Sequence, residues 1–340
     1  MVAQKSTTCS TRSGRCWTPE VSETGPRYGG TDGQPDRRAA LVALWRMSRP
    51  AQLALITLVY ALGVAMAFGR GADADVGAVA VGLVALLPTA ASVHYANEYA
   101  DAETDALTDR TPFSGGSGAL VESELPRSLA RRAAIASGGL GVALLAAGAA
   151  PVGGRALEAV PSVLLVAILL VGWQYSVGPL QLAWHGLGEV TNALVGGVAL
   201  PLYGFAVVTG SVSVAAVLAT VPFALVVFVN LLETQWPDRR ADAAVGKRTL
   251  ATRWYASRLR LAYGLGTLAA VGSAVALALF GGVFPRVVTL GTVLPMVGLL
   301  PGFYRFTGRE TPFPAVVTMV LVAAGSTVGW TLVATGAVTG

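Results

Sequence analysis

The sequence predicts an all-α membrane protein in which about nine transmembrane helices surround a central apolar cavity. Three observations predict this fold class. Of the 340 residues, 54% are hydrophobic and only 13% are charged, whereas soluble domains carry about 25% charged residues. The mean hydropathy is +0.61. Apolar runs of about 20 residues, the length that a helix needs to cross the hydrocarbon core, recur along the chain. This composition excludes a soluble domain, a disordered chain and a disulfide scaffold.

The first 44 residues predict a polar, disordered tail. They are rich in Ser, Thr, Gly, Arg and Pro and show almost no apolar pattern. The two cysteines, Cys9 and Cys16, both lie in this tail, and no histidine or second cysteine pair accompanies them. We therefore expect neither a zinc site nor a structural disulfide.

Nine apolar segments follow the tail and form the predicted membrane domain over residues 45–340. Each segment has about the length of a membrane-spanning helix, and each is rich in Gly and Ala, which favours close packing between helices in lipid. The segments cover residues 50–69, 76–98, 129–150, 159–178, 188–209, 212–234, 261–281, 285–305 and 313–338.

The basic residues predict the orientation of this domain. Of the 24 lysines and arginines, 21 lie in the tail or in the loops that follow even-numbered helices. Only Arg70, Arg155 and Arg286 lie on the other side. The positive-inside rule then places the tail and the even-numbered loops on the cytoplasmic side of the cell membrane. Because the basic residues form no single patch, the net charge of +5 does not indicate nucleic-acid binding.

An acidic segment follows the second predicted helix. It reads N-E-Y-A-D-A-E-T-D and spaces Asn97, Asp101 and Asp105 at i, i+4 and i+8. If the helix continues past the membrane, these side chains share one face, where stacked carboxylates repel each other. A divalent cation would relieve that repulsion, and oxygen ligands suit Mg²⁺. The alternative is a solvated loop that caps the helix.

A second acidic segment follows the sixth predicted helix and reads P-D-R-R-A-D-A-A-V-G-K-R. Asp238 and Asp242 are again spaced i and i+4, and Lys247 and Arg248 follow one turn later. Carboxylates that hold metal beside cations that hold phosphate oxygens make a phosphate site. The alternative for Lys247 is a membrane anchor at the cytoplasmic face. Both segments lie on the same predicted face, so together they predict a Mg²⁺-bridged diphosphate at the mouth of an apolar pocket.

These motifs resemble those of the UbiA superfamily of intramembrane prenyltransferases over about residues 45–340. The first matches N-D-x-x-D-x-x-x-D, with Glu98 where the second position is usually Asp. The second matches D-x-x-x-D followed by G-K-x-T-L-A, through Asp238, Asp242, Gly246, Lys247, Thr249, Leu250 and Ala251. A third stretch, Y-S-V-G-P-L from Tyr175 and then H-G-L-G-E up to Glu189, resembles the naphthoate-prenylating branch. The G-P-x-R element of that branch is replaced by S-G-G-S-G.

The resemblance implies transfer of an isoprenyl group from a diphosphate, geranylgeranyl or longer, to a lipophilic or aromatic acceptor. It implies Mg²⁺ at four carboxylates, Asp101, Asp105, Asp238 and Asp242. The same four residues and Lys247 are then the predicted catalytic residues, because metal and lysine neutralise the departing diphosphate. The predicted substrate-binding residues are Asn97, Arg49, Arg110, Tyr175, Glu189, Asn192 and Arg248. Arg49 and Tyr175 have alternative roles as interfacial side chains, and Glu189 as a carboxylate at a helix start.

Several alternatives remain open at this point. A quinone-precursor aromatic such as dihydroxynaphthoate is the favoured acceptor, and an ether-lipid precursor and a carotenoid are the rivals. A membrane transporter is the alternative from another class, but transporters keep charges near the bilayer midplane. Here the predicted helix centres are almost free of charge. The D-G-x-x-A-R signature of a lipid phosphotransferase is absent.

Overall fold

The computed structural model describes residues 37–73, 75–107, 116–150, 156–308 and 311–337. Within these ranges, nine helical spans are long and apolar enough to cross a membrane, and there is no strand. The predicted all-α fold with nine spans is therefore confirmed. The spans cover Arg37–Gly69, Val76–Asp105, Ser128–Ala149, Ala159–Ser176, Gly188–Thr209, Val214–Thr234, Ala256–Leu279, Arg286–Gly308 and Phe313–Ala334.

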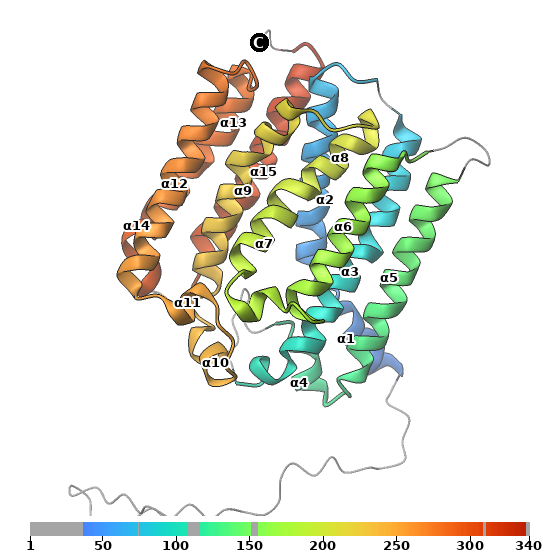
Figure 1. Ribbon diagram of the computed structural model, residues 1–340, viewed down its shortest axis with the longest axis vertical. Helices are drawn as coiled ribbons and strands as arrows, with labels where there is room; N and C mark the ends of the chain where they lie inside the picture. Colours follow the sequence, from blue (N-terminus) through green and yellow to red (C-terminus); the bar gives the residue numbers. More distant parts are fainter. Residues whose placement is uncertain (1–36, 74, 108–115, 151–155, 309–310, 338–340) are drawn as a thin grey trace, which may run out of the picture. The chain divides into compact units, whose positions relative to one another are not determined.

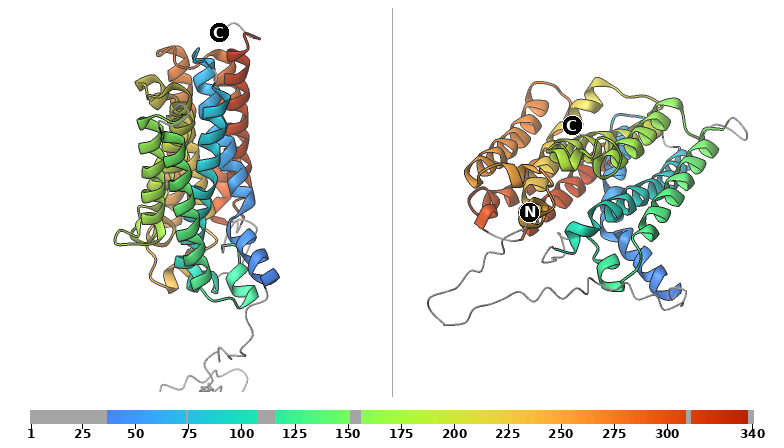
Figure 2. Two further views of the ribbon diagram at one scale, coloured as in Figure 1. Left: turned by 90° about the vertical axis from the view of Figure 1, so that its right-hand side faces the viewer. Right: turned by 60° about the horizontal axis from the view of Figure 1, so that its bottom comes forward.

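The spans run side by side as a helical bundle (Figure 1; Figure 2). Six spans are single helices: α3 (Val76–Asp105), α5 (Ser128–Ala149), α6 (Ala159–Ser176), α9 (Val214–Thr234), α12 (Ala256–Leu279) and α15 (Phe313–Ala334). Three spans combine consecutive helices. The first consists of α1 (Arg37–Met47) and α2 (Pro50–Gly69), the fifth of α7 (Gly188–Leu194), η2 (Val195–Ala199) and α8 (Leu200–Thr209), and the eighth of α13 (Arg286–Met296), η3 (Val297–Leu299), α14 (Leu300–Arg305) and η4 (Phe306–Gly308). Short helices lie between them: α4 (Ala119–Ser123), η1 (Leu182–His185), α10 (Arg239–Ala244) and α11 (Leu250–Arg253).

Two helices extend beyond the predicted apolar segments. α3 continues past residue 98 to Asp105, and α12 begins at Ala256 rather than at residue 261. Hydropathy marks where charged residues begin, whereas the backbone helix continues as long as its hydrogen bonds do. The extension of α3 places the first acidic motif on a helix, so its carboxylates can share one face.

Helical structure begins earlier than the predicted domain border at residue 45. α1 starts at Arg37, and its Ala43 and Met47 pack with Tyr95 of α3 and Leu120 of α4. These tertiary contacts stabilise a helix that is too short to be stable alone. The predicted disorder of the preceding tail concerns residues outside the described ranges.

Small residues allow the helices of the bundle to approach closely. Gly63 of α2 lies against the backbone carbonyl of Pro201 in α8, and Gly291 of α13 faces Gly325 of α15. A Cβ at any of these glycines would overlap backbone atoms of the neighbouring helix. Such close approach stabilises helix pairs in lipid, where the hydrophobic effect does not drive helices together.

The short helices α4, α10 and α11 gather at one end of the bundle, at the bottom of Figure 1. α3 and α9 both end there, and α10 contacts α3. The two acidic motifs, which are far apart in the sequence, are therefore brought to the same end of the bundle.

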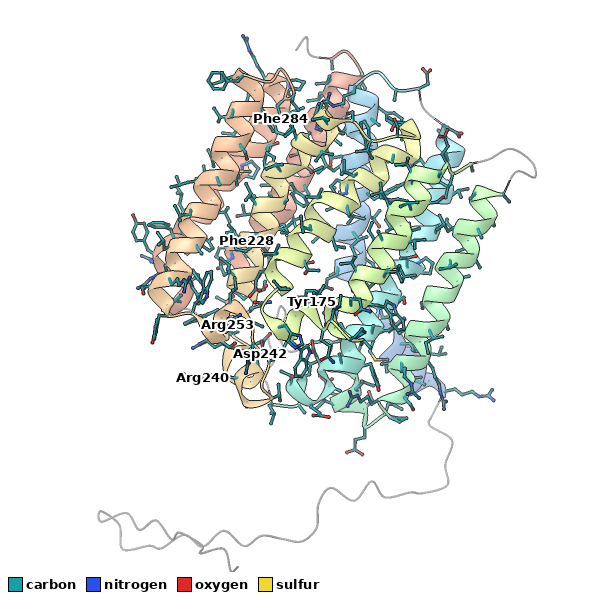
Figure 3. The ribbon with its side chains drawn as sticks, in the orientation of Figure 1. Tyr175, Phe228, Arg240, Asp242, Arg253 and Phe284 are labelled. Carbon is teal, nitrogen blue, oxygen red and sulfur yellow. The ribbon has the colours of Figure 1, made fainter. Side chains whose placement is uncertain are left out.

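A small apolar cavity lies between α2, α8, α9, α13 and α15. Its lining includes Leu62, Met66, Phe223 and Phe284. The volume of about 10 Å³ is enough for about one water molecule. Figure 3 shows Phe284 near the end of the bundle opposite to Asp242, so this cavity is separate from the acidic motifs.

Candidate active site

The first motif lies on the last turns of α3. Asn97, Asp101 and Asp105 share one helix face, as their spacing predicts. Asp101 is buried. After the helix, Gly116 comes back against Asp105, so closely that a Cβ on this glycine would overlap the carboxylate. Gly116 has φ +63°, a left-handed conformation that glycine adopts without strain.

The second motif lies on a short helix after α9. Asp238 is the residue before α10, and Asp242 lies in the first turns of that helix, where its N–H donates to the Asp238 carbonyl at 2.9 Å. Gly246 has φ +81° and turns the chain back. The N–H of Lys247 then donates to the carbonyl of Asp242 at 2.8 Å. This turn brings the lysine side chain beside the second carboxylate of the motif.

Lys247 joins the two motifs. Its Nζ lies 3.3 Å from Oδ1 of Asp101 and 3.4 Å from Oδ1 of Asp242. The three side chains are 13%, 11% and 3% exposed, respectively. The indole ring of Trp184 lies 5.9 Å from Nζ. One carboxylate from each acidic motif therefore meets the same buried cation, although the motifs come from different parts of the chain.

The charges in this cluster depend on one another. Burial alone would lower the pKa of Lys247, but Asp101 and Asp242 raise this pKa above its ordinary value. Burial raises the pKa of the Asp242 carboxyl, and Lys247 offsets only part of that effect. Lys247 contacts both of these buried carboxylates and reduces the repulsion between them.

Arg49 contacts the first motif from the start of α2. Its backbone is left-handed with φ 54°, and its guanidinium donates from Nε and Nη2 to Oε1 of Glu98 at 2.9 and 2.5 Å. In the amide orientation that satisfies all of its neighbours, Asn97 accepts from Nη2 of Arg49 at 3.2 Å. The Asn97 amide then donates to Oδ2 of Asp101 at 3.2 Å and to Oγ of Ser176 at 2.6 Å. Arg49 and Asn97 are thus both linked to the carboxylate face.

Tyr175 and Glu189 lie close to the same cluster. Tyr175, in the last turn of α6, interacts electrostatically with both Lys247 and Asp242, and Figure 3 shows it at the same end of the bundle as Asp242. Glu189 is fully buried at the start of α7, and its Oε1 accepts from the N–H of Leu250 at 2.7 Å. Glu189 therefore holds the segment that directly follows Lys247.

The remaining predicted residues are less closely connected to the cluster. Asn192 is half-buried on α7. The Arg248 side chain is exposed, while its backbone N–H donates to the carbonyl of Trp184 at 3.0 Å. Arg110 lies outside the described residues.

The sequence predicts no individual contact for Glu98, Ser117, Ser176 or Trp184, although the turn-forming run that ends at Ser117 is interpreted as part of a lid over the diphosphate. Ser176 contacts Asn97 and Trp184 lies beside Lys247, as described above. Ser117 contacts Glu98 through both its N–H and its hydroxyl. Glu98 and Ser176 lie within the sequence motifs described above, so their place in those motifs is a signal from which a role at the site could be predicted. Nothing in the spacing pointed to Ser117 or Trp184, because the path of a loop places them.

The sequence matches a known family over most of its length. A sequence model described as the UbiA prenyltransferase family matches residues 54–299. The chain belongs to this family. The matched range contains both acidic motifs and Lys247, so the resemblance found in the motifs is confirmed, whereas the match does not select the aromatic branch. With nine apolar helices in the part of the chain that the structure describes, this UbiA family member is an integral membrane protein. No curated protein matches the sequence significantly.

Three solved structures illustrate the similarity in fold. A UbiA homolog from Archaeoglobus fulgidus bound to GPP and Mg²⁺ is 19% identical, with a TM-score of 0.61 over 86% of this chain and 99% of that chain. A UbiA homolog from Aeropyrum pernix K1 is 16% identical, with a TM-score of 0.62 over 80% and 96%. A structure of digeranylgeranylglyceryl phosphate synthase is 13% identical, with a TM-score of 0.61 over 86% and 99%. At these identities, the likeness concerns the fold.

Proposed function

We propose that this protein is a Mg²⁺-dependent prenyltransferase that moves an isoprenyl group from an isoprenyl diphosphate to a lipophilic or aromatic acceptor. The observation that carries the proposal is the convergence of one carboxylate from each motif on Lys247. Family membership supports prenyl transfer, and the GPP and Mg²⁺ bound by the A. fulgidus homolog are consistent with it.

The chemistry of the donor set fits Mg²⁺. Asp101, Asp105 and Asp242 offer carboxylate oxygens at one end of the bundle, and Asp238 stands one turn before Asp242. Mg²⁺ prefers such hard oxygen ligands. The described residues contain no group of three acidic, histidine or cysteine side chains already arranged around a metal position. Lys247 already contacts Asp101 and Asp242, so we expect a metal ion at these oxygens to displace it from at least one carboxylate.

The side chains of the site must stabilise the negative charge of the departing diphosphate. Bound Mg²⁺ would neutralise negative charge that accumulates on the diphosphate as the allylic C–O bond breaks. Lys247, displaced from the carboxylates, would place its ammonium on the diphosphate oxygens. Arg49 supplies a second cation from α2, held beside Asn97 by Glu98. These cations accelerate ionisation because they bind the separated diphosphate more strongly than the intact ester.

The acceptor that we favour is an aromatic quinone precursor such as dihydroxynaphthoate. The Y-S-V-G-P-L stretch supports it, and Tyr175 in that stretch lies close to Lys247 and Asp242. An aromatic face stabilises an allylic cation, so this ring suits the step in which the acceptor attacks. Glu189 and Asn192, on α7, are the proposed polar residues on the acceptor side. The distribution of basic residues supports a cytoplasmic site, with the isoprenyl chain of geranylgeranyl length or longer in the apolar interior.

An acceptor screen tests the proposal. Membranes containing the protein receive labelled geranylgeranyl diphosphate, Mg²⁺ and, separately, dihydroxynaphthoate, 4-hydroxybenzoate or geranylgeranylglyceryl phosphate. A labelled lipid product in one lane, lost with EDTA, would identify the acceptor. We expect Asp101→Asn to lower its formation by about 10²–10³-fold, the usual cost of removing a charge-stabilising group. The matched control is Glu103→Gln, because Glu103 is an exposed carboxylate on the same helix and pairs with Arg127 at 3.2 Å. Absence of both product and Mg²⁺-dependent diphosphate binding would refute the proposal.

A further inference from the structure

Glu98 lies within the first motif, but its carboxylate does not contact Lys247 as the Asp101 carboxylate does. It binds Arg49 and Ser117 instead. Glu98 is 2% exposed. Oε1 accepts from Nε and Nη2 of Arg49 at 2.9 and 2.5 Å and from the N–H of Ser117 at 2.9 Å, and Oε2 accepts from Oγ of Ser117 at 2.6 Å. A carboxylate offers about four lone-pair sites. Three protein donors converge on Oε1 and one contacts Oε2, so both oxygens are engaged by the protein and only Oε2 keeps about one lone-pair site.

The two partners of Glu98 lie on different segments that both border the site. Arg49 directly precedes α2, and its Nη2 donates both to Glu98 and to Asn97. Ser117 follows Gly116, the residue that lies directly against the Asp105 carboxylate. A single buried carboxylate thus connects a cation at one border of the motif with a turn of backbone at the other.

A second arginine strengthens the attachment of this turn. Nη2 of Arg46, in α1, donates to the carbonyl of Ser117 at 3.0 Å, and Nη1 pairs with Oε2 of Glu122 in α4 at 2.8 Å. The hydroxyl of Ser117 also accepts from the N–H of Ala119 at 3.1 Å. Ser117 is therefore held at its N–H, its carbonyl and its hydroxyl, and Glu98 supplies two of these contacts.

We propose that Glu98 is a positioning residue of the diphosphate site. It fixes Arg49 and the Gly116–Ser117 turn on either side of the first motif, so that Arg49 faces the diphosphate and the turn encloses Asp105. The inference rests on the proposed function for the identity of the ligand, whereas the contacts that carry it are independent of that identity.

The arrangement connects two departures of this chain from the family pattern. Glu98 stands where Asp is usual, and S-G-G-S-G stands where the naphthoate branch carries G-P-x-R. Glutamate is one methylene longer than aspartate, and this length lets one carboxylate contact Arg49 and Ser117 together. Ser117 contributes the hydroxyl that donates to Oε2 of Glu98, and Gly116 permits the turn against Asp105. The glutamate at position 98 and the serine at position 117 therefore belong to the same set of contacts.

The variant Glu98→Gln shows whether Glu98 acts by positioning its partners or only through its charge, because the two roles predict opposite changes in the affinity for the diphosphate. Removing a negative charge near a diphosphate would tighten diphosphate binding if Glu98 acted only through its charge. If Glu98 positions Arg49 and the turn, binding weakens, because a neutral amide oxygen holds the Arg49 guanidinium and the Ser117 N–H less strongly than a carboxylate does, and an amide nitrogen cannot accept from the Ser117 hydroxyl. We expect the KM for the isoprenyl diphosphate to rise about tenfold, the effect of about 1.4 kcal/mol, and the KM for the acceptor to stay within about twofold.

Hydrogen exchange at the Ser117 amide provides a readout that needs no turnover. In the wild-type protein without substrate or metal, this amide should exchange slowly, because it donates to Oε1 of a buried carboxylate. We expect faster exchange in Glu98→Gln. Glu98→Asp, which keeps the charge but is too short to contact both partners, should show faster exchange with near-normal thermal stability. Glu103→Gln, on the exposed side of the same helix, is the matched control and should change neither readout.

The outcomes separate this inference from the proposed function. Faster Ser117 exchange together with weaker diphosphate binding in a folded Glu98→Gln protein would support it. Unchanged exchange, or diphosphate binding that is unchanged or tighter, would overturn it. If the wild-type protein transferred no isoprenyl group, the proposed function would fail. Exchange and the binding of inorganic pyrophosphate with Mg²⁺ would still test the role of Glu98.

Discussion

Replacing Lys247 with glutamine should change metal affinity and turnover in opposite directions. The ammonium of Lys247 lies 3.3 Å from Asp101 and 3.4 Å from Asp242, so it occupies the carboxylate oxygens that Mg²⁺ would use. Glutamine removes the charge while keeping a polar side chain of moderate length. Without substrate, Mg²⁺ should therefore bind more tightly. Prenyl transfer should become slower, because the departing diphosphate loses a cation.

The size of both effects follows from Coulomb's law and from the usual cost of such substitutions. A divalent ion and a unit charge about 6 Å apart repel by about 1.4 kcal/mol even at the dielectric constant of water, and by more in a partly buried site. This energy corresponds to about tenfold in affinity. We therefore expect the Kd for Mg²⁺ to fall at least about tenfold in Lys247→Gln. The kcat should fall about 10²–10³-fold, as when one preorganised charge-stabilising donor is removed.

Calorimetric titration of Mg²⁺ into purified protein without diphosphate measures the first effect, and product formation measures the second. Lys247→Arg, which keeps the charge, should bind Mg²⁺ with nearly wild-type affinity. Arg258→Gln is the control for net charge, because Arg258 is exposed and stacks on Trp254 at 4.3 Å, away from the motifs. A Lys247→Gln protein that binds Mg²⁺ no more tightly than the wild type would refute the competition between lysine and metal.

Two pairs of glycine substitutions test the backbone of the site and of the bundle. Gly116→Ala should lower prenyl transfer at least about tenfold, because its Cβ overlaps the Asp105 carboxylate. Gly71→Ala, also at positive φ but with nothing near its Cβ, should cost about 1–2 kcal/mol of stability and leave activity intact. Gly63→Ala should destabilise the protein by about 1–3 kcal/mol through overlap with α8. Gly272→Ala, in open space on α12, should be neutral or stabilising by up to about 1 kcal/mol. Thermal unfolding in detergent would measure these stability changes, and equal stability of Gly63→Ala and Gly272→Ala would contradict the packing argument.

The number of spans could be predicted because the bilayer constrains sequence strongly. Each span must be apolar over about 20 residues, and the sequence shows nine such runs. The rule fails where a helix leaves the membrane. Residues up to Asp105 are polar yet helical, and α1 is helical through packing of Ala43 and Met47 with Tyr95. These features depend on tertiary contacts, which a hydropathy pattern does not contain.

The candidate site could be predicted as far as its motifs extend. Asp101 and Asp242 were found from their four-residue spacing with Asp105 and Asp238, and Lys247 was found from its place after the second motif. The structure brings Asp101, Asp242 and Lys247 together, and the metal-binding and catalytic roles stay predictions.

The contacts between segments could not be predicted in the same way. Ser117 reaches Glu98 through a left-handed turn at Gly116, and the sequence gives no register between that loop and α3. Periodicity shows which residues share a helix face, whereas only the folded chain shows which loop lies against that face.

The acidic residues at this end of the bundle divide into two groups with different tasks. Asp101 and Asp242 share a cation, whereas the buried Glu98 and Glu189 each accept a backbone N–H, that of Ser117 before α4 at 2.9 Å and that of Leu250 at the start of α11 at 2.7 Å. Ser117 borders the first motif, and Leu250 lies three residues after Lys247. Protein carboxylates therefore anchor the chain at Ser117 and at Leu250, beside the two motifs. Charged groups that are already in place when the diphosphate leaves need little reorganisation during the reaction, and this preorganisation is the main source of electrostatic catalysis.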